Sequence, residues 1–126
     1  MGRRVNALVD TNVLVDYLQG RPEAAAELDR YHEVLVSAIS VAELVVGAGS
    51  PSRITAVDAL LRSCRVITVD EAIARDAGQL RRETRLRLPD ALVWACARAH
   101  GALLVTRDDG FPEGAPDVRM PYRLVP

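Results

Sequence analysis

Four short apolar segments, separated by segments with helical patterns, constrain the fold of this 126-residue chain more than any other feature. They lie at 5–9, 34–37, 65–69 and 102–106, and a further stretch at 122–125 predicts a fifth, edge strand. Short continuous apolar runs are typical of strands that are buried on both faces. Because helices connect these strands, we predict an α/β fold with a parallel sheet covered on both faces.

Proline and glycine mark the ends of the helices expected between these strands. Pro22, Pro51 and Pro89 stand where helices begin, and Gly20 and Gly101 stand where they end. The helices predicted in this way span residues 11–19, 22–31, 40–46, 51–63, 70–85 and 90–100.

The composition, with 49% hydrophobic and 26% charged residues, predicts a single globular domain over residues 1–126. A net charge near −1 means that any nucleic-acid-binding surface has to be a local patch. The apolar stretches are too short to cross a membrane or to act as a signal peptide, so we expect a cytoplasmic protein that does not bind membranes. Cys64 and Cys96 lie in apolar surroundings and are expected to be small buried side chains rather than a disulfide.

The chain contains no lysine, and all 16 of its basic residues are arginine. This absence excludes a P-loop, whose lysine contacts the phosphates, and Schiff-base chemistry, which needs a lysine amine. It also argues against phosphoacceptor domains, which resemble the surroundings of Asp10 but use a lysine as well.

Four acidic residues stand just beyond an apolar run or at the opening of a helix: Asp10, Glu43, Asp90 and Asp108. The carboxyl ends of parallel strands meet at one edge of the sheet, so we expect these side chains to converge there. Two carboxylates about 4 Å apart repel each other by roughly 4 kcal/mol at an effective dielectric constant near 20. The pattern therefore indicates a divalent metal held for phosphodiester chemistry.

Each of these acids also has a structural explanation. Asp10 could cap the first helix, and Glu43 could form a capping box with Ser40. Asp90 stands in a first helical turn, where the helix dipole favours negative charge. Asp108 begins an ordinary turn sequence. Spacing alone leaves both interpretations open, although the shared edge of the sheet favours a common site.

Three sequence motifs carry a resemblance to a known family. They are LVDTNVLVDYL, SAISVAELVVG and LRLPDALVWACARAHGALLVTRDDGF. Together they resemble the PIN domain, and the size and element order resemble the toxin subunits of VapBC-type toxin–antitoxin pairs. The resemblance implies a three-layer α/β/α sandwich with a four- to five-stranded, mostly parallel sheet. It also implies a Mg²⁺- or Mn²⁺-dependent endoribonuclease that acts as the toxin of a type II system.

The resemblance extends to individual residues. The acids at Asp10, Glu43, Asp90 and Asp108 match the four acidic positions of the family's motifs. Small polar residues that support the family's site are matched by Thr11, Asn12 and Thr106. Asp109 follows the fourth acid, and we interpret it as a turn residue rather than a further ligand.

The chemistry of the four acids gives a mechanistic hypothesis. Carboxylate and water oxygens suit hard cations such as Mg²⁺ and Mn²⁺, and no His or Cys cluster indicates zinc. In this hypothesis Asp10 and Asp108 bind one ion directly, and Asp90 completes its ligands or binds a second ion. Glu43 binds through water or orients the attacking water.

The sequence also suggests partners. Arg81, Arg82, Arg85 and Arg87 precede Asp90 and would grip RNA phosphates, although a solvated helix face is the simpler interpretation. The resemblance implies a cognate antitoxin, whose basic side chain would enter the acidic pocket, and a homodimer. Apolar residues that form part of the core or of an antitoxin groove are Val13, Leu14, Tyr17, Leu18, Leu44, Val45, Val46 and Ile54.

Two other functions are compatible with such a fold. One is a PIN-like module that binds RNA or protein without cleaving, and the other is a metal-dependent phosphatase on a similar sheet. The presence of all four acids argues against the non-cleaving module, because a degenerate site usually loses one of them.

Overall fold

The computed structural model describes residues 4–125 and contains a five-stranded parallel sheet with the order β3-β2-β1-β4-β5. The predicted parallel sheet is therefore confirmed. The strands are β1 (Ala7–Val9), β2 (Val34–Ser37), β3 (Arg65–Ile67), β4 (Leu103–Val105) and β5 (Val118–Arg119).

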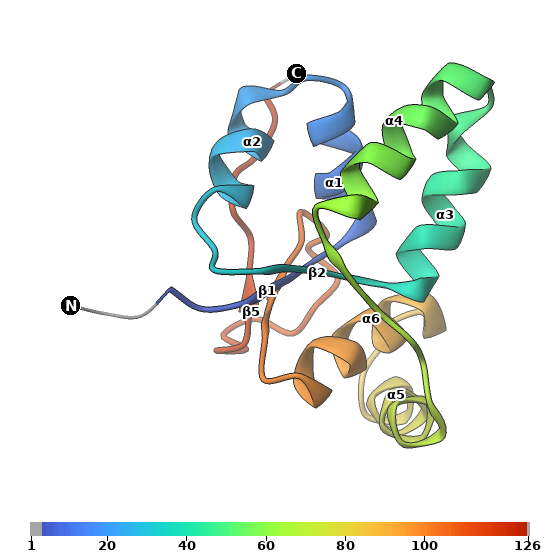
Figure 1. Cartoon of the computed structure of the whole chain (residues 1–126). Coiled ribbons are helices and arrows are strands. Elements are labelled where there is room, and N and C mark those ends of the chain that lie inside the picture. Colours follow the sequence, from blue (N-terminus) through green and yellow to red (C-terminus); the bar gives the residue numbers. More distant parts are fainter. Residues whose placement is uncertain (1–3, 126) are drawn as a thin grey trace.

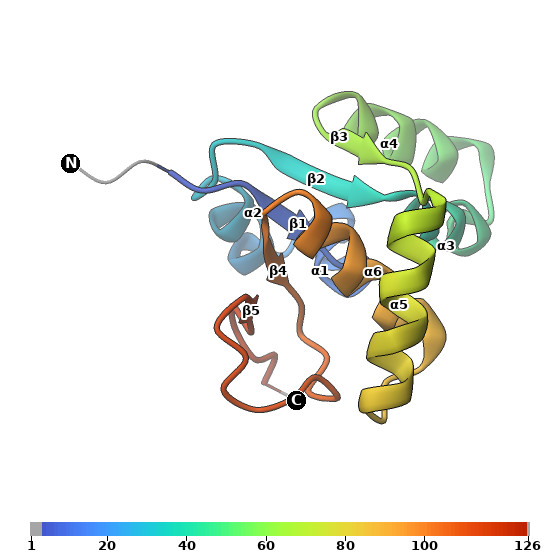
Figure 2. The same ribbon diagram turned by 90° about the horizontal axis from the view of Figure 1, so that it is seen from below.

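Helices cover both faces of the sheet, which confirms the three-layer α/β/α arrangement (Figure 1). One face carries the first four helices, and Figure 2 shows α5 and α6 packed side by side on the other. The helices are α1 (Thr11–Leu18), α2 (Pro22–Leu28), α3 (Ala38–Ala48), α4 (Pro51–Arg62), α5 (Glu71–Glu83) and α6 (Leu88–Ala99). Within the part of the chain that the structure describes, no helix has the length and apolar character needed to cross a membrane.

The strand residues alternate between two hydrophobic cores. Leu8 and Leu104 face the core formed with α5 and α6, whereas Val9 and Val105 face the core formed with α1 to α4. All four side chains are fully buried. This alternation follows from the twofold period of a strand, and burial of both faces explains why the runs are continuously apolar.

The helix α3 begins earlier than the sequence predicted. The Ser37 hydroxyl accepts a hydrogen bond from the Ser40 backbone N–H at 3.1 Å and so caps the helix. Ser40 therefore lies inside the first turn, and the predicted capping box between Ser40 and Glu43 is wrong. Gly49 ends α3 in the left-handed region, with φ of 72°.

The fifth strand is also displaced from its predicted position at residues 122–125. The observed strand is Val118–Arg119, which pairs with β4 through Leu104↔Val118 and Val105↔Arg119. It is a short edge strand, and its second residue is fixed by the bidentate bond of the Arg119 guanidinium to Glu27 of α2. The 122–125 segment is apolar for a different reason, since Tyr122 packs against the core of α1 to α4.

Trp94 and the two cysteines pack in the hydrophobic cores. Trp94 is buried and meets Phe111 edge to face, with 5.7 Å between ring centroids. Its indole N–H donates to Asp117 at 2.9 Å, which satisfies its one polar group. Cys96 is buried and Cys64 is half-buried, and both are free thiols as predicted.

The order of the strands defines where a ligand can bind. From β1 the chain builds the sheet outward through β2 and β3, and it then returns to place β4 on the other side of β1. In open α/β sheets, ligands bind at the carboxyl ends of the strands where this reversal occurs. In this protein that position lies between β1 and β4.

Replacing Glu27 with Gln should lower the free energy of unfolding by about 2–3 kcal/mol. The Glu27 carboxylate is buried and accepts both nitrogens of the Arg119 fork, at 2.8 and 3.0 Å. The amide cannot accept both bonds, so it leaves the guanidinium poorly paired beside α2. Urea unfolding at pH 7.5 measures the effect. The exposed Glu23→Gln in the same helix is the control, and an equal loss in both variants would contradict the prediction.

Candidate active site

The four predicted acids come from four different elements around the reversal point between β1 and β4. Asp10 follows β1, and Asp108 follows β4 after two intervening residues. Glu43 lies on α3, and Asp90 lies in the first turn of α6. The two strands are neighbours in the sheet, which explains how residues 98 positions apart come to one edge.

Asp10 is the buried member of the group, with 6% of its surface exposed. One carboxylate oxygen accepts from the Thr11 backbone N–H at 2.8 Å, and the other accepts from the Thr106 hydroxyl at 2.8 Å. The cap predicted for Asp10 is therefore present, but it occupies only one of the two oxygens. Burial, reinforced by the negative charges of Asp90 and Glu43 and opposed by the two hydrogen bonds, raises the pKa of Asp10 to about 6.

The Thr106 hydroxyl links the two strand ends. Its oxygen accepts from the Asp108 backbone N–H at 3.0 Å and from the Asn12 amide at 3.3 Å. Since both lone pairs are then in use, its proton is directed to Asp10. One buried side chain thus holds the Asp10 carboxylate and the Asp108 backbone in a fixed relation.

Glu43 is exposed on α3, and its carboxylate accepts from the Thr11 hydroxyl at 2.7 Å. Thr11 thereby connects α3 to the start of α1, beside Asp10. Because the cap of α3 is Ser37, the Glu43 side chain is not needed for capping and is directed to the site instead.

Asp90 and Asp108 are both half-buried. Burial is the largest influence on the pKa of Asp90, and it acts with the charges of Asp108 and Glu43 to raise that pKa. The Arg87 guanidinium, 3.6 Å from Asp90, opposes the shift, but its side chain is 83% exposed and neutralises little. Asp108 accepts from the Gly110 backbone N–H at 2.9 Å, which confirms the predicted turn.

The four carboxylates form one electrostatic group, since Asp10 is influenced by Asp90 and Glu43, and Asp90 by Asp108 and Glu43. Among residues 4–125, however, no three acidic, histidine or cysteine side chains lie close enough together to form a ready metal cluster. Each acid is held by its own hydrogen bond or ion pair. Their oxygen donors and their uncompensated charge fit a hard divalent cation, on which the side chains can close.

The arginines predicted to contact RNA surround the connection between α5 and α6. Arg81 and Arg82 lie in the last turn of α5, and Arg85 and Arg87 lie in the segment that follows. All four are exposed, and Arg87 makes the ion pair with Asp90 described above. The positive patch therefore adjoins the acids at one point only.

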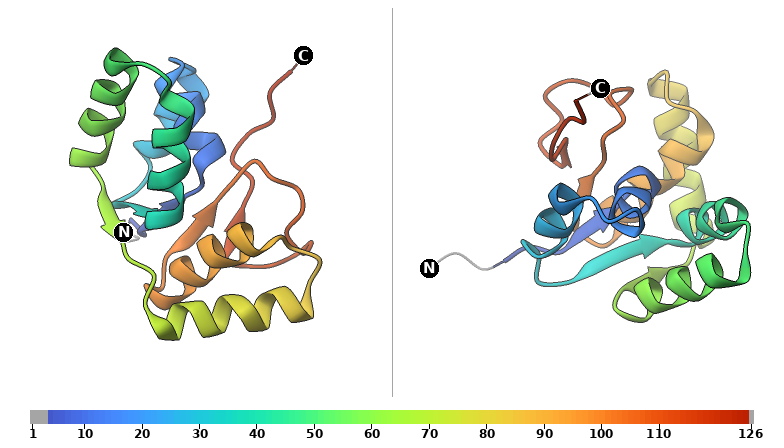
Figure 3. Two further views of the ribbon diagram at one scale, coloured as in Figure 1. Left: turned by 90° about the vertical axis from the view of Figure 1, so that its right-hand side faces the viewer. Right: turned by 90° about the horizontal axis from the view of Figure 1, so that it is seen from above.

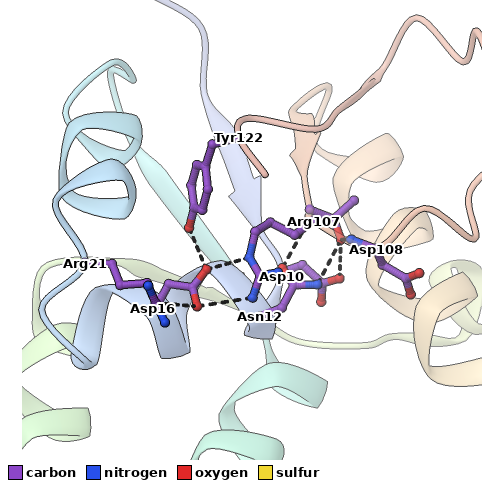
Figure 4. A network of polar contacts seen from close by, with 8 residues as sticks. Asp10, Asn12, Asp16, Arg21, Arg107, Asp108 and Tyr122 are labelled. Carbon is purple, nitrogen blue, oxygen red and sulfur yellow. Dashed lines mark hydrogen bonds and ion pairs between the residues drawn. The ribbon is translucent and has the colours of Figure 1, made fainter. Parts of the chain in front are cut away.

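Sequence reasoning missed a second buried carboxylate close to the site (Figure 4). Asp16, only 3% exposed, accepts from the side chains of Arg107 and Tyr122. A signal was present in the sequence, because Asp16 lies three residues after Val13 and so falls on the buried side of the helix.

A groove of about 400 Å³ lies between α1, α3 and α4. Its floor includes Leu18 and Leu44, and its rim carries Glu43 and Arg53. Of the residues predicted for the core or for a groove, Val13 and Leu14 are fully buried, and Val46 is 85% exposed. Since Glu43 belongs to both the groove and the acidic group, the two features are contiguous.

Comparison with known proteins identifies relatives over most of the chain. Residues 7–115 match the PIN domain family. Ribonuclease VapC19 from two strains of Mycobacterium tuberculosis is 35% identical over 125 residues, which cover 91% of this chain and 98% of that protein.

Solved structures show the same architecture. A toxin–antitoxin complex from Klebsiella pneumoniae contains a chain with 35% identity and a TM-score of 0.87, with coverage of 94% of this chain and 99% of that one. The FitAcB structure from Neisseria gonorrhoeae gives 28% identity and a TM-score of 0.67, with coverage of 82% and 88%. DNA-bound VapBC from Salmonella typhimurium, at 22% identity and a TM-score of 0.77 over 91% and 96% of the two chains, shares the fold.

In metal-free protein, Asp10→Asn should increase stability at pH 8 but not at pH 4. A folded-state pKa near 6, above the unfolded value of 3.8, means that ionised Asp10 destabilises the fold progressively as the pH rises from about 4 through 6. Two pKa units correspond to about 3 kcal/mol, and the poorer match of Asn to the Thr106 hydroxyl removes part of this gain, so we expect a net gain of about 1–2 kcal/mol.

Urea unfolding in EDTA across this pH range measures the difference. Asp109→Asn, at the exposed neighbouring position of the same loop, serves as the control. A difference for Asp10→Asn that stays constant between pH 4 and pH 8 would contradict the prediction.

Proposed function

Since the chain belongs to the PIN domain family, we propose that it is a metal-dependent endoribonuclease and the toxin of a type II toxin–antitoxin pair. The observation that carries this proposal is the group of four carboxylates at the reversal point of the sheet, with a buried member whose pKa is raised to about 6. Support comes from a relative with 35% identity that is named a ribonuclease, and from a chain of equal identity in a toxin–antitoxin complex.

The metal-binding roles follow from burial and position. Asp10 and Asp108 hold the ion, because Thr106 fixes one carboxylate and the backbone of the other. Asp90 adds a third carboxylate from α6, which packs on the opposite face of the sheet from α1. A Mg²⁺ or Mn²⁺ ion bound there supplies positive charge that activates water and stabilises the phosphate oxygens.

Glu43 has a different role in this proposal. It is more exposed than Asp10, and the Thr11 hydroxyl holds it at the rim of the site. A carboxylate in that position can accept a proton from, or orient, a water molecule that attacks the phosphate. Thr11 and Asn12 act as supports, since each binds a side chain or a backbone group of the site.

The exposed arginines at the α5–α6 connection are the proposed RNA contacts. Arg81, Arg82 and Arg85 extend the positive charge away from Arg87 and the acids. A phosphate chain that follows these arginines would reach the site beside Asp90. Single-stranded or looped RNA is the expected substrate, because the interior of a duplex offers less access to a side-chain site.

The groove between α1, α3 and α4 is the proposed antitoxin site. Apolar side chains of a partner segment would occupy the floor at Leu18 and Leu44, and Glu43 at the rim leads directly to the acids. A basic side chain of that partner would compensate the same negative charge that a metal ion does. A homodimer, as the family resemblance implies, remains part of the proposal.

The cleavage test uses purified protein with Mg²⁺ at about 5 mM. The three substrates are mixed RNA, single-stranded DNA and a small phosphate ester. We expect cleavage of RNA alone, its loss in EDTA, and a fall of at least about 100-fold for Asp10→Asn and for Asp108→Asn. Asp109→Asn should retain activity, as a turn residue. Binding of RNA without cleavage would support the non-cleaving module, and hydrolysis of the ester alone would support the phosphatase.

Replacing Arg81, Arg82 and Arg85 together with Gln should raise KM for RNA and leave kcat nearly unchanged. If each arginine contacts one phosphate, each contributes about 0.7 to the steepness of the plot of log binding constant against log salt concentration. Loss of all three should therefore make this slope shallower by roughly 2. Fluorescence anisotropy with the catalytically inactive Asp108→Asn protein as background measures binding. A triple variant of Arg4, Arg62 and Arg65, which are exposed and lie outside both α5 and the groove beside the acids, is the control, and equal slopes in both would refute the assignment.

A further inference from the structure

We propose that Asp16, Arg107 and Tyr122, which we call the α1 clamp, set the position of Asp108 and so tune the metal affinity of the candidate site. These are positioning residues, and the inference rests on the proposed function. It assigns a role to the C-terminal segment of the chain, which the sequence predicted only as an edge strand.

The centre of the α1 clamp is a carboxylate that is saturated with donors. One oxygen of Asp16 accepts from Arg107 Nε at 2.6 Å and from the Tyr122 hydroxyl at 2.7 Å, and the other accepts from Arg107 Nη2 at 3.2 Å (Figure 4). Arg21 lies 3.9 Å from the second oxygen as an outer ion pair. A bidentate fork of this kind fixes the direction of the guanidinium as well as its distance.

Arg107 is held by α1 at two points. Its guanidinium binds Asp16, and its backbone N–H donates to the Asn12 side-chain oxygen at 3.1 Å. Asn12 and Asp16 are four residues apart and therefore lie on the same face of the helix. Because both ends of Arg107 are tied to one rigid element, the chain can leave β4 in only one direction.

Asp108 is the next residue, so its position depends on the direction in which the chain leaves Arg107. Its backbone N–H donates to the Thr106 hydroxyl, so the residues on both sides of the Arg107 backbone are fixed to the site. The Asp108 carboxylate itself is held within its turn by Gly110. Release of the Arg107 side chain would leave this backbone held only by its hydrogen bonds to Asn12 and Thr106, and the Asp108 carboxylate could then shift relative to Asp10.

Tyr122 brings the C-terminal segment into the same unit. Figure 3 shows the chain after β5 running along the side of the sheet that carries α1 and α2. Burial is the main influence that raises the pKa of Tyr122, followed by the hydrogen bond to Asp16, so the hydroxyl remains a donor at neutral pH. Likewise, the hydrogen bonds that the Arg107 guanidinium donates to Asp16 raise the pKa of Arg107.

The protein contains a second cluster of the same chemistry, which we call the α2 clamp: Glu27, Arg119 and Tyr31. Here too a buried carboxylate accepts an arginine fork and a tyrosine hydroxyl. The α2 clamp fastens β5, and within residues 4–125 its side chains make no hydrogen bond or ion pair with the predicted site residues. Its one link to them is through the backbone, since the Arg119 carbonyl accepts from the Thr106 N–H at 3.0 Å, and side-chain substitutions keep this bond. It therefore provides a matched control for any loss of stability.

The experiment compares three matched pairs of variants in the full chain: Asp16→Asn with Glu27→Gln, Arg107→Lys with Arg119→Lys, and Tyr122→Phe with Tyr31→Phe. Lysine keeps the charge but cannot form the fork. Calorimetric titration with Mn²⁺ gives metal affinity, and RNA cleavage gives kcat and KM. Circular dichroism and urea unfolding check that each variant is folded.

We expect Asp16→Asn and Arg107→Lys to weaken Mn²⁺ binding by about 10- to 100-fold and to lower kcat with little change in KM. Tyr122→Phe, which removes one of several hydrogen bonds, should weaken Mn²⁺ binding by about threefold. The α2 clamp variants should lose stability but bind Mn²⁺ within about twofold of the wild type. The double variant of Asp16 and Arg107 should be no weaker than the worse single variant, because the two act as one unit.

Equal losses of Mn²⁺ affinity in both clamps, or none in either, would overturn the positioning role. If Asp16→Asn does not fold, Arg107→Lys and Tyr122→Phe carry the test. If the wild type binds Mn²⁺ but leaves RNA intact, and the α1 clamp variants bind Mn²⁺ more weakly, the clamp is supported and the proposed function is refuted. If the wild type cleaves RNA and the α1 clamp variants bind Mn²⁺ as tightly as it does, the proposed function is supported and the clamp is refuted.

Discussion

The burial of the Asp10 carboxylate near other acids, at the reversal point of the sheet, is the constraint on which the rest of the site depends. The pairing of β1 with β4 brings Asp10 and Asp108 to one edge, and α3 and α6 add Glu43 and Asp90. Each of these elements is stable because its apolar face is buried in one of two cores. The cores therefore provide the free energy that offsets the cost of placing like charges near one another. The pKa of Asp10 is raised chiefly by its burial, and the charges of Asp90 and Glu43 add to the shift.

The hydrogen bonds of the site direct these charges rather than neutralise them. A guanidinium within the group would compensate the carboxylates, but the nearest ion pair uses the exposed Arg87 at 3.6 Å. Thr11 and Thr106 instead donate neutral hydroxyls to Glu43 and Asp10. Hydroxyl donors orient a carboxylate while leaving most of its charge available, which is what a site for a dication requires. Among residues 4–125, the two most buried arginine forks bind Asp16 and Glu27, which lie outside the acidic group.

The sequence was sufficient for the parts of the fold that depend on local patterns. The continuous apolar run before Asp10 predicted β1, and the proline at 89 predicted the start of α6 within two residues. Prediction from the sequence failed where contacts between distant residues determine the structure. The cap of α3 at Ser37 released Glu43 for the site, and pairing with β4 rather than apolar character placed β5 at Val118–Arg119. Asp16 was missed for the same reason, since its partners lie 91 and 106 residues away along the chain.

The short helix α1 explains why so much of the site depends on few residues. Its N-cap is Asp10, its first turn carries Asn12, and its second turn carries Asp16, so three successive levels of one rigid helix contact the end of β4 or the C-terminal segment. Rigid placement on a helix is more exact than placement on a loop. Arginine is the residue that can complete this arrangement. Its planar guanidinium donates two hydrogen bonds to a carboxylate and so fixes its own orientation, and its charge persists at any physiological pH. A lysine at position 107 would keep the charge balance around Asp16 but lose the orientation, and orientation is what Asp108 receives from its neighbour.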